Sequence, residues 1–272
     1  MTATVQTQSN EASAGGQTPL VELRNVGKSY GHIHALKDIS LRVHAGQVTG
    51  ILGDNGAGKS TLIKIIAGLH QQTEGELLVD GEPTKFSSPA DALGKGIATV
   101  YQNLAVVPLM PVWRNFFLGQ EVRKKSFPYS LDANAMRATT LAELAKMGIE
   151  LPDVDAPIGS LSGGQRQCVA IARAVFFGAR VLILDEPTAA LGVKQSGVVL
   201  KYITAAKEAG FGVVFITHNP HHAHMVGDHF VLLNRGRQKL DCTYDEISLE
   251  HLTQQMAGGD ELEALSHELG RK

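Results

Sequence analysis

Residues 53–61 read Gly-Asp-Asn-Gly-Ala-Gly-Lys-Ser-Thr, after a short apolar run over residues 48–52 and before an apolar-periodic run over residues 62–69. This order predicts a strand that enters a helix through a glycine-rich loop. Glycines let backbone N–H groups reach phosphate oxygens with no Cβ in the way, at a helix start that favours anions. The stretch therefore predicts a triphosphate site, with Lys59 bridging the β- and γ-phosphates and the Ser60 hydroxyl ligating Mg²⁺.

The candidate nucleotide-binding residues of this loop are Gly53, Asn55, Gly56, Ala57, Gly58, Lys59, Ser60 and Thr61. The competing interpretation is a glycine-rich turn that carries a lysine by chance. It explains the pattern less well, because the contexts of a strand and of a helix are both present around the loop.

The composition excludes several classes of protein. The 272 residues are 43% hydrophobic, enough for one large core or two modest ones, and the net charge of −2 gives no reason to expect a nucleic-acid partner. No run approaches the ~18 uncharged apolar residues that cross a bilayer, and residues 1–19 lack a secretion signal. We therefore expect a cytosolic chain that touches a membrane only through a partner. Cys168 and Cys242 have no paired spacing and are expected to be buried.

The segment before the loop holds strands and one notable aromatic residue. Residues 1–19 are small and polar and are predicted to be disordered. Strand-like runs follow over residues 20–26 and 39–43, with Tyr30 between them in a turn marked by Gly27 and Gly31. Tyr30 is a candidate platform for adenine, since a purine can stack on its face. The alternative is a tyrosine that packs the turn.

Beyond the loop, two more short strands are expected. Residues 76–79 run into an Asp80-Gly81 turn that predicts a hairpin, and residues 97–100 form an apolar strand. Gln102 comes two residues after that strand, where its amide oxygen can turn towards a metal or a water. By itself, Gln102 would be only a surface polar residue.

Residues 103–158 differ in composition from the segments around them and predict an inserted helical subdomain. Residues 104–118 are apolar and aromatic and include Trp113 and Phe117, and Asp132 is placed to cap a following helix. The aromatic residues either pack internally or leave a patch for a partner protein. In the second case, Gln102 and residues 113–117 would transmit nucleotide-driven closure to that partner.

A second helix start of the anion-binding kind occurs at residues 161–167, Leu-Ser-Gly-Gly-Gln-Arg-Gln. Ser162 is placed as the N-cap, with Gly163 and Gly164 in the first turn. Glycine forms helix poorly, so its presence here suggests the close approach of another group, and a phosphate suits a helix N-terminus.

Two adjacent acids follow a buried strand over residues 181–184. Asp185 and Glu186 would emerge at the carboxyl end of that strand, where open parallel sheets bind ligands. Asp185 can hold Mg²⁺ through water, while Glu186 can polarise an attacking water. His218 ends another strand, residues 213–216, and would lie next to the γ-phosphate.

The carboxyl-terminal part offers histidines and a further hairpin. Besides His218, the chain has His221, His222, His224 and His229, which we expect on a solvated helix and its end rather than in a metal site. A hairpin over residues 230–236 and a helix over residues 249–256 follow, and residues 257–272 form an acidic, amphipathic tail.

Taken together, these motifs resemble those of ATP-binding cassette ATPases, the nucleotide-binding subunits of membrane transporters, over about residues 20–256. The matching elements stand in family order: the adenine-stacking aromatic Tyr30, the Walker A loop at residues 53–61, the Q-loop Gln102, the signature at residues 161–165, the Walker B strand ending in Asp185 and Glu186, and the switch histidine His218. The signature is specific, because other P-loop proteins lack it.

The resemblance implies an α/β fold, a P-loop NTPase core of RecA type with an antiparallel β subdomain and an inserted α-helical subdomain. It implies ATP and Mg²⁺ as cofactors, with Mg²⁺ held by Ser60, Gln102 and Asp185, and catalysis by Glu186 and His218. In the family, two cassettes sandwich two ATP molecules, so Ser162, Gly163, Gly164 and Gln165 would serve the site of a second copy.

The sequences of several motifs are similar to those in ATPase subunits of bacterial importers for ribose, xylose or fructose. This likeness implies integral membrane permease partners, an indirect periplasmic or lipid-anchored substrate-binding protein, and a place at the cytoplasmic face of the membrane. One departure is Gly192, where the family usually has an aspartate that links the two sites. Three alternatives remain: a soluble ATPase acting on a ribosome or nucleic acid, a transporter ATPase for another substrate, and a regulatory module that binds ATP without hydrolysing it.

Overall fold

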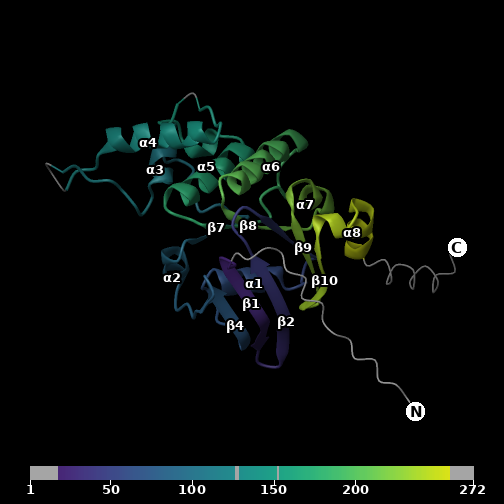
Figure 1. The fold of residues 1–272 in the computed structure, drawn as a ribbon. Helices are drawn as coiled ribbons and strands as arrows, with labels where there is room; N and C mark the ends of the chain where they lie inside the picture. Colours follow the sequence, from purple (N-terminus) through teal and green to yellow (C-terminus); the bar gives the residue numbers. More distant parts are fainter. Residues whose placement is uncertain (1–17, 126–128, 152, 258–272) are drawn as a thin grey trace, which may run out of the picture.

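The computed structural model describes residues 18–125, 129–151 and 153–257, and its strands form two sheets (Figure 1). One sheet has the strand order β2-β1-β4-β5, and the other has the order β10-β9-β3-β8-β7-β6. The predicted disordered segment (1–19) and acidic tail (257–272) lie outside the described residues, apart from residues 18–19 and 257.

The first sheet is antiparallel. It contains β1 (Val21–Tyr30), β2 (Ile33–Val43), β4 (Glu74–Val79) and β5 (Glu82–Pro83), and the predicted hairpin turn at residues 80–81 joins the last two. The placement of Tyr30 in a turn was wrong, because Tyr30 ends β1 and pairs with Ile33. Shifts in register along β1 admit Gly27 into the strand, where it pairs with Glu74 of β4. A glycine can occupy such an irregularity without ending the strand.

The second sheet positions the motifs. Its parallel strands are β3 (Val48–Leu52), β6 (Ile97–Val100), β7 (Val181–Asp185), β8 (Gly212–Thr217) and β9 (His229–Asn234), with β10 (Arg237–Thr243) antiparallel at the edge. The carboxyl ends of parallel strands meet at one edge, so the segments that follow β3, β6, β7 and β8 share that edge.

Alternating side chains of this sheet pack into two hydrophobic clusters. Val181 and Ile183 of β7 pack with one cluster and Leu182 and Leu184 with the other, as expected of a strand covered on both faces. The first cluster includes side chains of α1 (Lys59–Ile66) together with those of β1 and β2, so α1 lies between the two sheets.

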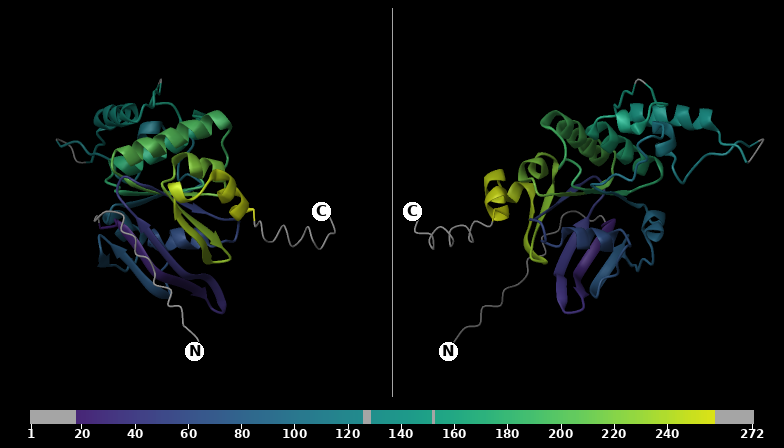
Figure 2. Two further views of the ribbon diagram at one scale, coloured as in Figure 1. Left: turned by 45° about the vertical axis from the view of Figure 1, so that its right-hand side comes forward. Right: turned by 180° about the vertical axis from the view of Figure 1, so that it is seen from behind.

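The second cluster lies under helices on the opposite face. Figures 1 and 2 show the green helices α5 (Gly163–Phe176) and α6 (Val193–Glu208) on one side of the six-stranded sheet and the purple antiparallel strands on the other. The remaining elements are α2 (Pro89–Gly94), α3 (Val112–Phe116), α4 (Ala133–Lys146), α7 (Pro220–Val226), α8 (Leu249–Met256) and 3₁₀ turns at Ile158–Ser160 and Tyr244–Glu246. Within the described ranges, no helix has both the length and the apolar content needed to span a bilayer.

The aromatic residues of the helical region pack internally. Trp113, Phe116 and Phe117 are 6%, 0% and 2% exposed, so of the two alternatives the patch formed by these rings is wrong. The reason lies in α5, whose Phe176 packs against both phenylalanine rings at centroid distances of 5.5 and 5.7 Å. Any transmission of closure by residues 113–117 therefore cannot pass through direct contact of Trp113 or Phe117 with a partner.

Candidate functional site

The loop after β3 has the backbone that its glycines predict. Gly53, Gly56 and Gly58 have φ values of +143°, +84° and +107°, a region that favours glycine. A Cβ at Gly53 would lie 2.4 Å from the Leu233 carbonyl oxygen, and one at Gly58 would lie 2.7 Å from Leu36 Cδ2. The backbone at Leu233 and the side chain of Leu36 therefore close one side of the loop.

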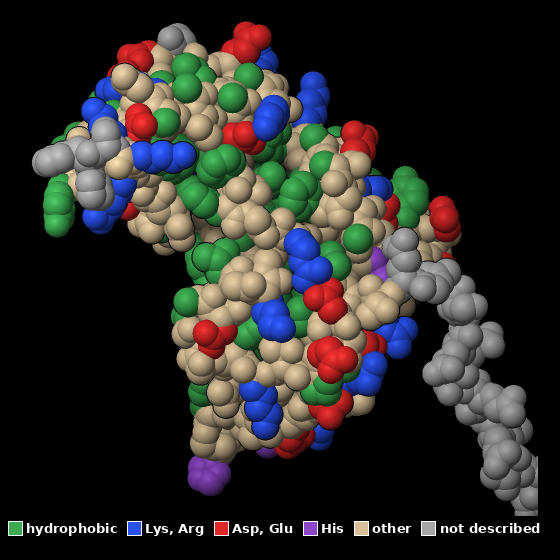
Figure 3. Space-filling view, turned by 60° about the vertical axis from the view of Figure 1, so that its left-hand side comes forward, with side chains coloured by type: hydrophobic (Ala, Val, Ile, Leu, Met, Phe, Trp, Pro, Cys, Tyr) green, Lys and Arg blue, Asp and Glu red, His purple; other side chains and the backbone are tan. Residues whose placement is uncertain are grey.

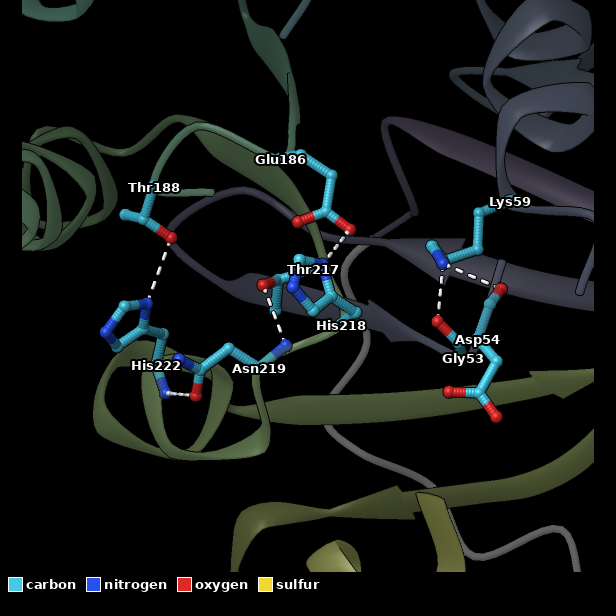
Figure 4. Close-up of polar contacts among 9 residues, drawn as sticks. All are labelled: Gly53, Asp54, Lys59, Glu186, Thr188, Thr217, His218, Asn219 and His222. Atoms are coloured by element: carbon cyan, nitrogen blue, oxygen red, sulfur yellow. Dashed lines mark hydrogen bonds and ion pairs between the residues drawn. The ribbon is translucent and has the colours of Figure 1, made fainter. Parts of the chain in front are cut away.

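Lys59 is buried at the start of α1, where its ammonium group donates to the carbonyl oxygens of Gly53 and Asp54 (Figure 4). Burial lowers the pKa of Lys59, while the charges of Glu186 and Asp54 act in the opposite direction. The lysine is thus a desolvated cation held inside the loop, an arrangement suited to an anionic ligand.

Asp185 and Glu186 stand at the carboxyl end of β7. Burial and the charge of Glu186 raise the pKa of Asp185, and Lys59 opposes this effect. Glu186 has φ of +48°, uncommon for a non-glycine residue, and its backbone N–H donates to the Ile216 carbonyl oxygen at 3.0 Å. Its Oε1 lies 2.9 Å from His218 Nδ1, while its buried Oε2 has no hydrogen-bond partner (Figure 4).

This donor set fits Mg²⁺. Ser60, Gln102 and Asp185 supply a hydroxyl, an amide oxygen and a carboxylate, and Mg²⁺ prefers such oxygen donors. A divalent cation would also relieve the unfavourable burial of the Asp185 charge beside Glu186. In the described part of the chain, no three His, Cys, Asp or Glu residues are grouped as metal ligands. In proteins, Mg²⁺ is often bound through one or two carboxylates together with substrate phosphates.

A cavity of about 290 Å³ connects Gln102 to the catalytic candidate Glu186. Gln102, Glu186 and Gly163 all line it, so the structure brings together the Q-loop, the acid after β7 and the start of α5. Gln167 also lines this cavity and is 5% exposed, yet its Nε2 has no hydrogen-bond partner. Sequence reasoning missed Gln167, which only its position one helical turn after Gly163 could have signalled.

Ser162 caps α5 as expected. Its Oγ accepts from the Gln165 backbone N–H at 3.3 Å, and its own N–H donates to Gln165 Oε1 at 2.9 Å. The two glycines have a reason within the chain, because a Cβ at Gly163 would lie 2.6 Å from Leu191 Cδ2, and one at Gly164 would lie 3.3 Å from Gln195 Cβ. A phosphate is therefore not the only group that approaches this helix start. Ser162 and Lys59 form no hydrogen bond with each other in the described chain.

Tyr30 is 44% exposed at the end of β1. The His70 ring meets its ring edge to face at a centroid distance of 5.8 Å, and Lys28 Nζ lies 5.1 Å from the ring centroid. The strand paired with β1 carries Leu36, which packs against Gly58, so the hairpin borders the nucleotide loop. An exposed ring at this place remains available for stacking on a base.

The other histidines do not share one environment. His221, His222 and His224 lie on α7, as the sequence predicts. His229 instead lies in β9, where its Nε2 is 2.6 Å from Asp241 Oδ1, so its placement on the end of a helix was wrong. Cys168 and Cys242 are both buried, as expected.

Comparison with known proteins explains why these motifs occur together. The family model described as ABC transporter matches residues 36–189, more than half of the chain. This chain belongs to the ABC transporter family. The cassette is 43% identical to a xylose/arabinose import ATP-binding protein of Sulfolobus acidocaldarius, over 87% of this chain and 93% of that protein. It is 42% identical to a fructose import ATP-binding protein of Rhizobium meliloti, over 82% and 87% of the two chains.

Solved structures of cassettes have the same fold. A nucleotide-free ATP-binding cassette of an ABC transporter superposes with a TM-score of 0.73 at 24% identity, over 88% of this chain and 95% of that one. A dimeric cassette bound to ADP and Pi, in a post-hydrolysis state, gives a TM-score of 0.69 at 29% identity, over 82% and 98% of the chains. The cassette is thus an α/β P-loop NTPase core with an antiparallel β subdomain and a helical subdomain, as the sequence predicts.

Proposed function

We propose that this cassette hydrolyses ATP to drive the import of a monosaccharide through a membrane permease, at the cytoplasmic face of the membrane. The observation that carries the ATPase is the Glu186 to His218 contact of 2.9 Å, at the sheet edge that also bears Lys59. The sugar class rests on the relatives, which are named as importers of xylose or arabinose and of fructose.

The proposed roles follow from the geometry of each group. Tyr30 stacks on adenine, and Lys59 leaves the loop carbonyls to bind the β- and γ-phosphates among the N–H groups of residues 53–61. Mg²⁺, held by Ser60, Gln102 and Asp185, supplies positive charge that offsets the charge of the phosphates. Glu186 orients the attacking water and accepts its proton at the unpartnered Oε2, while His218 fixes Oε1.

A second copy of the chain completes each site. The start of α5, with Ser162, Gly163, Gly164 and Gln165, would contact the γ-phosphate bound to the other copy, and the N–H groups of Gly163 and Gly164 take no part in the capping bonds between Ser162 and Gln165. Such contacts exist only when the dimer is closed, and moving an equilibrium from 1:99 to 99:1 requires about 5.5 kcal/mol of differential affinity. Charge-assisted hydrogen bonds to the γ-phosphate would supply this differential affinity.

The permease would dock on an apolar hollow between the helical region and the sheets. A cavity of about 410 Å³ lies there, lined by Leu93, Tyr101, Leu104, Val106, Leu118 and Phe177. Figure 3 shows this flank hollowed between the upper, helical part and the part below, with hydrophobic side chains gathered in it. Unlike the buried Trp113, Leu93 and Tyr101 are partly exposed, at 43% and 36%. An apolar hollow of this kind suits a protein partner.

Release of phosphate from Mg-ATP tests the proposed chemistry. We expect Glu186→Gln to lower kcat by at least about a hundredfold with little change in ATP affinity, because it removes a proton acceptor and keeps the shape. Lys59→Ala should instead abolish nucleotide binding by calorimetry. Wild-type turnover in Glu186→Gln would contradict the role of Glu186, and unchanged affinity in Lys59→Ala would contradict that of Lys59.

The partner and the substrate class need a separate test. Purification of the chain from membranes should recover a permease, and transport by the reconstituted complex should require a pentose or hexose together with ATP. A ribosome or nucleic acid recovered instead would favour the soluble ATPase. Phosphate release that stays absent with the permease present would favour the regulatory module suggested by Gly192.

A further inference from the structure

Thr188 and His222 come from different elements and meet beside the catalytic candidates. Thr188 Oγ1 lies 3.0 Å from Nδ1 of His222, which is on α7 (Figure 4). Thr188 is 4% exposed, and its position is two residues after Glu186. Neither residue belongs to the motifs predicted to contact ATP. The imidazole is the partner of a hydroxyl that would otherwise be buried without one.

The backbone of His222 is fixed to the strand that carries His218. Thr217 ends β8, and its Oγ1 accepts from the Asn219 backbone N–H at 3.0 Å. Asn219 caps α7, and its Oδ1 accepts from the His222 backbone N–H at 3.2 Å. The ring of His222 therefore reaches Thr188 from a turn that is tied to His218, as Figure 4 shows.

Thr188 lies in the turn between Glu186 and α6. The Ala189 N–H donates to the Glu186 carbonyl oxygen and the Leu191 N–H donates to the Thr188 carbonyl oxygen, both at 3.2 Å. Leu191 packs so closely on α5 that a Cβ at Gly163 would lie 2.6 Å from it. The turn is thus held in its middle by α7 and at its far end by the start of α5, while Glu186 occupies its near end in a left-handed conformation.

We propose that His222 is a positioning residue for ATP hydrolysis, which acts through Thr188 to hold the turn that aims Glu186 at the attacking water. The side chain of Glu186 leaves a backbone with φ of +48°, a conformation that persists only when the surrounding structure enforces it. The Thr188 contact supplies that support next to the acid. A movement of α7 would also be transmitted through this turn and Leu191 to Gly163.

The protonation of the ring agrees with this role. Burial lowers the pKa of His222, and the charges of His221 and His218 act in the same direction. The ring is therefore neutral near pH 7, and one proton serves the bond between Nδ1 and Oγ1. Either the hydroxyl donates to Nδ1 or the N–H donates to the hydroxyl, so the contact holds in both tautomers.

Amide substitutions of His222 test which nitrogen matters. The side-chain amide of Asn reaches about the position of Nδ1, whereas that of Gln reaches about the position of Nε2. We expect His222→Ala and His222→Gln to lower kcat of the full chain with Mg-ATP about fivefold or more, with KM within about twofold. His222→Asn should restore most of kcat, and His221→Ala, on the exposed side of α7, should leave it unchanged.

Substitutions of the partner complete the test. Thr188→Val should match His222→Ala, Thr188→Ser should retain kcat, and the double variant His222→Ala/Thr188→Val should be no slower than the slower single variant. Circular dichroism and calorimetric ATP affinity establish that each variant is folded and binds nucleotide. The proposal is overturned if His222→Ala keeps wild-type kcat, if Asn and Gln are equally slow, or if the two losses multiply.

This proposal rests on the proposed role of Glu186, and the two can fail separately. If Glu186→Gln hydrolyses ATP at the wild-type rate, the role of Glu186 fails first. If Glu186→Gln is inactive while the His222 variants are not, only the positioning role is overturned.

Discussion

At the scale of single residues, two adjacent acids have different environments. Asp185 is partly buried on β7 next to another carboxylate, which disfavours its ionised form. Glu186 is turned out of the strand by its left-handed backbone and is paired at one oxygen with His218. One position thus favours a cation ligand and the other a proton acceptor, although the sequence shows only two neighbouring acids.

Replacement of Asp185 should separate stability from function. Its pKa in the folded chain is above its ordinary value of 3.8, so its favourable contribution is complete below pH 3.8 and is lost as pH rises through the folded value. Near pH 7, Asp185→Asn should therefore stabilise the nucleotide-free chain by about 0.5–2 kcal/mol while abolishing Mg²⁺-dependent hydrolysis.

Thermal unfolding at neutral and acidic pH measures this effect. The gain should shrink towards pH 4, and the matched variant Asp245→Asn, at an exposed position, should change stability little at either pH. A lower melting temperature of Asp185→Asn at pH 7 would contradict the electrostatic interpretation.

At the scale of elements, the aromatic lead-in to the helical region is structural. Trp113 on α3 donates from Nε1 to Asp155 Oδ1 at 2.9 Å, and the Arg137 guanidinium of α4 lies 4.8 Å from its ring centroid. Asp155 also pairs with Arg137 at 2.8 Å. The tryptophan therefore joins α3 to α4 and to the segment before α5.

Loss of the Trp113 ring should lower the stability of the helical region. We expect Trp113→Ala to cost about 3–5 kcal/mol, since it removes a large buried side chain and leaves a cavity. Denaturant unfolding followed by circular dichroism measures the cost, with Leu109→Ala, at a residue 88% exposed, as the matched control. Equal and small losses in both variants would mean that the ring does not support this region.

At the scale of the whole molecule, one chain holds two different helix starts that suit phosphate. The loop before α1 leads into Lys59, whereas the start of α5 packs against Leu191. A dimeric cassette bound to ADP and Pi is among the similar structures.

A stable closed dimer should form when hydrolysis is blocked. Glu186→Gln with Mg-ATP should double its mass by light scattering, because in the proposed shared site an intact γ-phosphate contacts the α5 start of the second copy. Glu186→Gln/Lys59→Ala should stay monomeric under the same conditions. A Glu186→Gln chain that binds ATP by calorimetry and remains monomeric would exclude the shared site.

Much of the fold could be predicted because its signals are local. The apolar runs predict β3, β6, β7 and β8 within one residue at each end. Side-chain caps at Asp132 and Ser162 mark the starts of α4 and α5, since an N-cap bonds only to its own first turn. The glycine spacing likewise predicts the loop of residues 53–61, because the positive φ values of Gly53, Gly56 and Gly58 are a local property of glycine.

The sequence by itself determined the strand–loop–helix around Lys59, the acids at the end of β7 and the histidine after β8. Only the tertiary structure decided that Trp113 is buried, that Gly163 packs on Leu191 and that His222 meets Thr188 across 34 positions. Caps and turns depend on bonds within a few residues, which local patterns encode. Contacts between distant segments depend on how helices pack on the sheet, and no local pattern specifies that packing.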